Sequence, residues 1–171
     1  MSHGPDNFPQ RNLPLLMLQA REQVIRRFRP LLNEAGLTEQ QWRVIRVLLE
    51  TGSLEVRQIG ALCHLSSPSL AGILARMEDL NLISRERQDF DQRRVVVSLR
   101  PKSRDLAKRL APQIRATYRA LEDALGAATC QKLYAVLDDV IAALGAAGGA
   151  PAVDDADRPA GRGRGPATRQ S

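Results

Sequence analysis

The fold is decided by residues 66–99, which read SSPSLAGILARMEDLNLISRERQDFDQRRVVVSL. The stretch begins with Ser66 and Ser67, whose hydroxyls can cap a helix, and with Pro68, which suits a position in the first turn. Apolar residues then recur at helical spacing as far as Asn81, which ends the pattern. The first half of the stretch therefore predicts an amphipathic helix.

The second half of the stretch predicts a β-hairpin. Residues 82–87 and 94–99 read as short strands, and the polar residues 88–93 form the tip between them. The solvent face of the preceding helix carries mainly small residues near its start, where a surface helix usually carries long charged side chains. We therefore expect something bulky to approach this face, whose residues are Pro68, Gly72, Ala75, Arg76 and Asp79.

Two more helices are predicted immediately before this stretch. Thr38 and Gln41 can form a capping box that opens a helix ending at Gly52. A short helix over residues 55–63 follows, and it connects tightly to the next one. Its inward residues are predicted to be Val56, Ile59, Leu62 and Cys63. The helix over residues 55–63 and the amphipathic helix that begins near Ser66 predict a helix-turn-helix, and the hairpin after them predicts a wing. The chain as a whole is predicted to be mainly α.

The outer helices are predicted to form a dimer. Residues 12–35, 101–125 and 128–144 carry long apolar stripes that find few partners inside a small DNA-reading unit, residues 37–99. A two-fold dimer would bury these stripes. Within the first helix, Pro30 is expected to kink or shorten the last turn. Outside this domain of residues 12–144, we expect a flexible arm over 1–11 and a disordered tail over 145–171.

The charge of the chain favours a nucleic-acid partner. Lys and Arg total 25 against 19 Asp and Glu, for a net charge of +6 and an isoelectric point near 10.1. A basic protein can displace counterions from phosphates. An Arg-rich, Ala-rich composition can also reflect genome base composition, so charge alone leaves both explanations open.

The predicted helix-turn-helix and wing supply the candidate DNA contacts. A recognition helix enters the major groove, and arginines on a loop suit a narrow minor groove. Two such helices in a dimer would match a palindromic operator. Asp91 is expected to orient Arg93 or Arg94 through an ion pair. The candidate DNA-binding residues are Ser66, Ser67, Pro68, Ser69, Gly72, Arg76, Arg85, Arg87, Asp91, Arg93 and Arg94.

Other classes of protein fit the sequence less well. The only Cys and His residues are Cys63, Cys130, His3 and His64, which are not at ligand spacing, so no metal site, other cofactor or enzymatic centre is expected. Without a secretion signal or a long apolar run, a soluble cytoplasmic protein is expected. A thiol-sensing regulator using Cys63 or Cys130 stays open, as does a helical adaptor for another protein.

Across residues 12–144 the chain resembles the MarR family of bacterial regulators. The resemblance rests on LTEQQWRVIR (37–46), PSLAGILARME (68–78) and DQRRV (91–95), and the first two are similar to the subgroup that represses homoprotocatechuate (4-hydroxyphenylacetate) catabolism. It implies a repressor released from its operator by an aromatic acid. The chain departs from the family after the second wing strand, where LRPKS (99–103) replaces Leu-Thr-x-x-Gly.

The resemblance also implies an effector site between the dimerisation helices and the DNA-reading unit. Arg21 could pair with the carboxylate of an aromatic acid, Trp42 could stack on its ring, and Arg46 lies one turn further on. Equally, Trp42 could be a core residue that anchors its helix, and the two arginines could form ion pairs between subunits.

Overall fold

The computed structural model describes residues 11–88 and 91–147 of the chain. The fold class is confirmed: helices dominate, and the strands form one small sheet. In chain order the elements are α1 (Leu13–Ile25), α2 (Arg29–Glu34), α3 (Glu39–Thr51), β1 (Leu54–Glu55), α4 (Val56–Cys63), α5 (Ser67–Asp79), β2 (Ile83–Gln88), β3 (Asp91–Leu99), α6 (Pro101–Leu125) and α7 (Ala127–Ala147).

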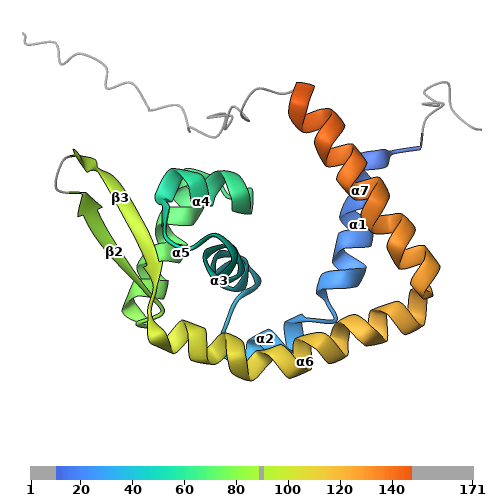
Figure 1. The fold of residues 1–171 in the computed structure, drawn as a ribbon, viewed down its shortest axis with the longest axis horizontal. Coiled ribbons are helices and arrows are strands. Elements are labelled where there is room, and N and C mark those ends of the chain that lie inside the picture. The colour runs from blue at the N-terminus through green and yellow to red at the C-terminus, as the bar shows by residue number, and fades with distance from the viewer. Residues whose placement is uncertain (1–10, 89–90, 148–171) are drawn as a thin grey trace, which may run out of the picture.

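The elements form two groups joined by α6 (Figure 1). The sheet and α3, α4 and α5 gather at one end of this 25-residue helix, and α1 and α7 stand side by side at its other end. The expected arm and tail lie mostly outside the described residues, although α7 continues to Ala147, past the predicted end at residue 144.

The first predicted helix is wrong as a single element. Residues 12–35 form two helices, because the chain turns between Ile25 and Arg29. In this turn the hydrogen bonds span three residues instead of four: Arg27 N donates to Val24 O, and Phe28 N donates to Ile25 O. Pro30 lies in the first turn of α2, where its missing N–H costs no helical hydrogen bond. The proline therefore helps to begin a helix and does not kink one.

The start of α3 is confirmed in detail. Thr38 N donates to Gln41 Oε1 at 2.9 Å, and Gln41 N donates to Thr38 Oγ1 at 3.2 Å, which completes the capping box. Val44, Ile45 and Leu48 face the core from this helix. The cap fixes where α3 begins, and its apolar face fixes how it packs.

The sheet has one more strand than predicted. The two residues of β1 pair antiparallel with β3, Leu54 opposite Val97 and Glu55 opposite Val96, so the described strands follow the order β1-β3-β2. Glu55, expected to be helical, is both a strand residue and the N-cap of α4. The extra pairing joins the base of the wing to the helix-turn-helix.

The turn between α4 and α5 is compact. His64 takes the left-handed conformation with φ 49°, and Leu65 N donates to Gly60 O at 3.0 Å. A Cβ at Gly60 would stand 3.4 Å from both Leu65 O and Leu70 Cδ2, so α4 has little spare room beside α5. Ser66 is the N-cap of α5, but among the described contacts its hydroxyl donates to Ser69 Oγ and not to the backbone.

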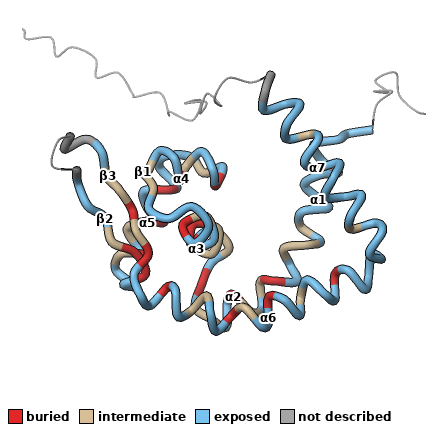
Figure 2. Tube along the Cα trace, viewed as in Figure 1, coloured by how far each residue is buried: buried red, intermediate tan, exposed pale blue. Residues whose placement is uncertain are grey.

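The buried core lies where α3, α4, α5 and the sheet meet the first half of α6 (Figure 2). Pro101 begins α6 in its first turn as predicted, and buried Ser103 donates to Leu82 O at 2.5 Å. Leu62 was predicted to face inward and instead is 52% exposed, because α4 turns that side of its surface to solvent.

The other end of the molecule has almost no core. α1, which lies wholly within the described part of the chain, contains no buried residue, and residues 127–145 of α7 contain none either. The large apolar side chains exposed on these two helices include Leu13, Leu15, Leu18, Tyr134, Val136, Ile141 and Leu144. Exposed apolar surface of this extent is typical of an interaction site.

Replacing Ile59 by Ala should lower the free energy of unfolding by about 2–5 kcal/mol, because a fully buried side chain would leave a cavity in the core. Leu62→Ala on the same helix is the matched control and should change it by less than about 0.5 kcal/mol. Urea unfolding at one fixed protein concentration measures both. Equal losses for the two variants would contradict the orientation of α4.

Candidate nucleic-acid interface

The solvent face of α5 presents small polar groups at its amino end. Ser66, Ser67, Pro68 and Ser69 are all exposed, and Leu70 N donates to Ser66 O at 2.9 Å as the first helical bond. The helix dipole and the free N–H groups of the first turn favour an anion at this end. The short side chains leave these backbone groups accessible.

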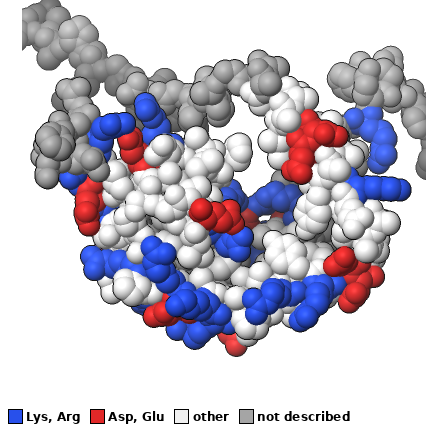
Figure 3. All heavy atoms as spheres, viewed as in Figure 1, with Lys and Arg blue, Asp and Glu red and all other residues white. Residues whose placement is uncertain are grey.

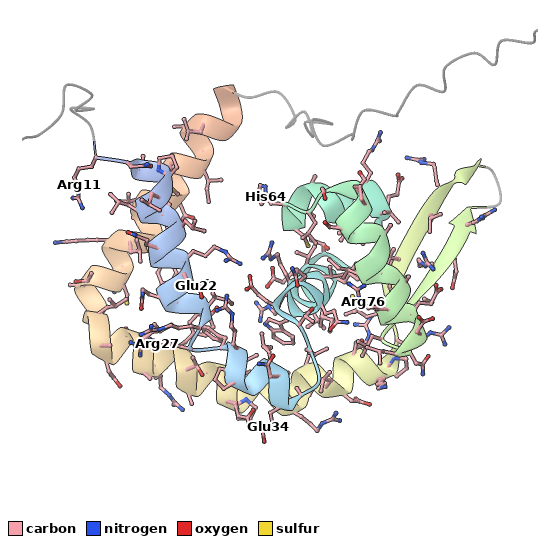
Figure 4. All side chains as sticks on the ribbon, turned by 180° about the vertical axis from the view of Figure 1, so that it is seen from behind. Arg11, Glu22, Arg27, Glu34, His64 and Arg76 are labelled. Carbon is pink, nitrogen blue, oxygen red and sulfur yellow. The ribbon has the colours of Figure 1, made fainter. Side chains whose placement is uncertain are left out.

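Arg76 lies on this face one turn beyond Gly72. Its Nη1 stands 3.6 Å from the place where a Cβ at Gly72 would be, so the side chain folds back over the glycine. Arg76 is exposed and points outward from α5 (Figure 4). The face therefore carries one long cation, which in this structure lies over the half-buried Gly72.

Carboxylates anchor two of the predicted wing arginines. Arg85 on β2 forms an ion pair with Glu78 on α5, and its Nε donates to Glu78 Oε2 at 2.7 Å. This hydrogen bonding by Arg85 holds the pKa of the Glu78 carboxyl below its usual range. The pair connects the wing to α5.

Arg94 on β3 makes the second connection, with its Nη2 2.7 Å from Glu55 Oε1 at the start of α4. Glu55, which the sequence did not predict as a partner of Arg94, reaches this strand because β1 pairs with β3. The side chains of Asp91 and Arg93 lie outside those that the structure describes, and Arg87 is exposed on β2.

A cavity of about 410 Å³ lies between α3 and α6. Trp42, Arg46 and Leu49 line it from α3, and Arg104, Ala107, Lys108, Ala111, Ile114 and Arg115 line it from α6. Its wall combines an indole and aliphatic groups with four cationic side chains. Figure 3 shows Lys and Arg gathered along the edge that α6 forms.

The structure brings together two of the three predicted effector residues. Trp42 and Arg46 line the cavity, and Arg46 also pairs with Glu50. Among the described residues Arg21 does not line it and instead forms an ion pair with Glu39. The sequence did not predict Arg104, Lys108 and Arg115 as part of this site, although their spacing places them along one side of a helix.

Cys63 is fully buried at the end of α4. Burial raises the pKa of its thiol, and the nearby charge of Arg43 opposes this only in part. Within residues 11–88 and 91–147, no three His, Cys, Asp or Glu side chains are grouped as metal ligands would be. None of the helices described has the length and apolar content needed to cross a membrane.

Comparison with known proteins identifies the fold and its family. Residues 35–94 match the sequence model of the MarR family. The chain is 37% identical over 128 residues to the HTH-type transcriptional regulator FarR of Neisseria gonorrhoeae, covering 75% of this chain and 85% of that protein. It is 37% identical over 131 residues to the homoprotocatechuate degradative operon repressor of Escherichia coli, covering 77% and 88%.

Among solved structures, NadR in complex with 4-hydroxyphenylacetate is similar with a TM-score of 0.69 and 34% identity, covering 82% of this chain and 97% of that one. Each of these three similarities covers three quarters or more of the chain, which is longer than the predicted DNA-reading unit of residues 37–99. The chain described here belongs to the MarR family of winged helix-turn-helix transcriptional regulators.

Proposed function

We propose that this protein is a repressor that binds a palindromic operator in double-stranded DNA as a homodimer. The observation that carries the proposal is the joint presentation of the small-faced helix α5 and an arginine-bearing wing. Arg85 connects the wing to α5 and Arg94 connects it to α4, so the two reading elements hold one relative orientation. A duplex can meet both at once.

A second copy of the chain supplies the cover that α1 and α7 lack. Their exposed apolar side chains lie at the end of the molecule away from α5 (Figure 1). Two-fold pairing through this end leaves both copies of α5 free. A spacing of about 34 Å between them would match successive major grooves.

Each candidate residue has a distinct role in this proposal. The serines at the start of α5 donate to phosphates or base edges, Gly72 permits close approach, and Arg76 binds a phosphate or a guanine. Arg87 and Arg93 are the wing residues assigned to the minor groove, with Asp91 beside them. Arg85 and Arg94 mainly orient the wing, because carboxylates already hold their guanidinium groups.

The DNA for this test is the region upstream of the protein's own gene. If Arg76 contacts a base, Arg76→Ala should weaken binding to this DNA by about 1–3 kcal/mol. If Arg76 contacts a phosphate, the slope of the logarithm of the binding constant against the logarithm of the salt concentration should become smaller by about one. Fluorescence anisotropy at several salt concentrations separates the two. Arg27→Ala, at the opposite end of the molecule, is the control (Figure 4). If Arg76→Ala changes neither the affinity nor the salt dependence, the result would count against α5 as the recognition helix.

The effector in this proposal is a small phenolic or aromatic acid bound in the cavity between α3 and α6. Trp42 offers a face for the ring, and the cationic side chains offer partners for the carboxylate. The similar NadR complex contains 4-hydroxyphenylacetate, and the E. coli relative represses an aromatic degradation operon. We therefore assign genes of aromatic-acid catabolism as targets. Arg21 is not assigned to the effector, because among the described residues it does not line the cavity.

Titration calorimetry with 4-hydroxyphenylacetate should show saturable binding, and Arg46→Ala should weaken it about tenfold through loss of a charged hydrogen bond. Arg109→Ala is the matched control, because this exposed arginine of α6 does not line the cavity within the described structure. Binding that is equally strong in both variants would place the effector elsewhere. Release of the operator by the same acid, seen in a mobility shift, tests the response.

The two alternatives raised by the sequence receive little support. A thiol sensor needs an accessible thiol of low pKa, whereas Cys63 is buried and its pKa is raised. The partly exposed Cys130 is the remaining candidate for this alternative. A helical adaptor would not need the wing, and the named relatives are transcriptional regulators.

In a Cys130→Ser variant, the remaining thiol of Cys63 should react with Ellman's reagent only after urea is added, because burial blocks access and disfavours the thiolate. The wild-type protein, which keeps the partly exposed Cys130, is the comparison. Fast modification of Cys63 in the folded variant would revive the thiol-sensing alternative.

A further inference from the structure

One carboxylate gathers arginines from three helices. Glu39, in the first turn of α3, forms ion pairs with Arg21 of α1, with Arg29 of α2 and with Arg43 of its own helix. Arg43 Nη2 lies 2.8 Å from Glu39 Oε1, and Arg29 Nη2 lies 3.7 Å from Glu39 Oε2. The Glu39 side chain is only 18% exposed, so water screens these pairs less than pairs at the open surface.

Arg43 extends the contact to the turn before the recognition helix. Its Nη1 donates to the carbonyl oxygen of Cys63, the last residue of α4, at 2.7 Å. The next residue, His64, takes the left-handed conformation and leads to the start of α5. Arg21, Glu39, Arg43 and the Cys63 carbonyl thus form a continuous polar path from α1 to the turn of the helix-turn-helix.

A second carboxylate, Glu22 on α1, adds another ion pair to this path. Arg29 donates through both of its terminal nitrogens to Glu22, with Nη2 2.9 Å from Oε2. A bidentate pair of this kind fixes the relative orientation of its partners as well as their distance. α1 is therefore held by charged side chains at two positions, Arg21 and Glu22, on adjacent residues.

Apolar packing alone leaves the orientation of α1 loosely defined. Of the described residues of α1, only Val24 and Ile25, at its last turn, pack against the core cluster. Apolar contacts have little directional preference, whereas hydrogen-bonded ion pairs have a definite geometry. The angle between α1 and the DNA-reading helices thus depends on the charged contacts at Glu39.

We propose that Glu39 is a positioning residue that sets the orientation of α5 relative to α1, and through the dimer sets the separation of the two recognition helices. The inference rests on the proposed dimer, in which α1 belongs to the shared interface. Without the Glu39 charge, Arg21, Arg29 and Arg43 are left close together with like charges, so the path opens. Each half of the dimer then samples a wider range of helix separations.

Pulsed electron–electron double resonance on the dimer, which measures the distance between two spin labels, tests this inference without an effector or an operator. A spin label at Ala71→Cys, on the exposed side of α5, reports the distance between the two recognition helices in a Cys130→Ser background, with buried Cys63 retained. Glu39→Gln should widen the distance distribution about twofold, as the loss of the charged contacts between α1 and α3 implies. Glu34→Gln, an exposed carboxylate on α2, is the control and should leave the distribution unchanged.

A second variant keeps the inference falsifiable if Glu39→Gln unfolds. Arg43→Lys retains the charge facing Glu39 and loses the forked donor that also reaches the Cys63 carbonyl, so it should widen the distribution as well. A distribution of parental width in a folded Glu39→Gln or Arg43→Lys variant would overturn the role of Glu39. A parent protein with no dipolar coupling would instead overturn the dimer, and this inference with it.

Discussion

The packing of α4 and α5 against the sheet is the constraint on which the other features depend. Ile59, Met77 and Val97 are fully buried at this junction, and Gly60 allows the two helices to approach within contact distance. Because protein interiors are close-packed, this apolar cluster allows α5 only one packed orientation on the domain. The exposed face of α5 is then whatever the apolar stripe does not use, namely the serines, Gly72 and Arg76.

Charged contacts complete what the apolar core leaves undefined. Arg85–Glu78 and Arg94–Glu55 orient the wing, while Glu39 and its arginines connect α1 to the helix-turn-helix. Surface ion pairs contribute little to stability on average. Hydrogen-bonded ion pairs have a definite geometry, so their contribution in this fold is to the relative orientation of the elements that they join.

The distribution of burial explains why one copy of the chain is an incomplete unit. The DNA-reading end has a full core, whereas α1 and α7 expose leucine, isoleucine and tyrosine side chains along their length. The 25-residue helix α6 spans both ends and carries the cationic wall of the cavity beside Trp42. A ligand in that cavity would contact α3 and α6 together, so it could favour one arrangement of the two ends over another.

The sequence by itself determined the features that depend on near neighbours in the chain. Helical spacing located most helices, the Thr38–Gln41 box marked the start of α3, and Pro101 marked the start of α6, since caps and stripes act over three or four residues. Tertiary structure alone decided β1, the break before α2, the outward side of Leu62, and the partners of Arg21 and Arg94. A two-residue strand has no periodicity to detect. Glu55 and Arg94 are separated by 38 residues in the sequence and meet only after the sheet forms, because which charges pair depends on packing that no local pattern encodes.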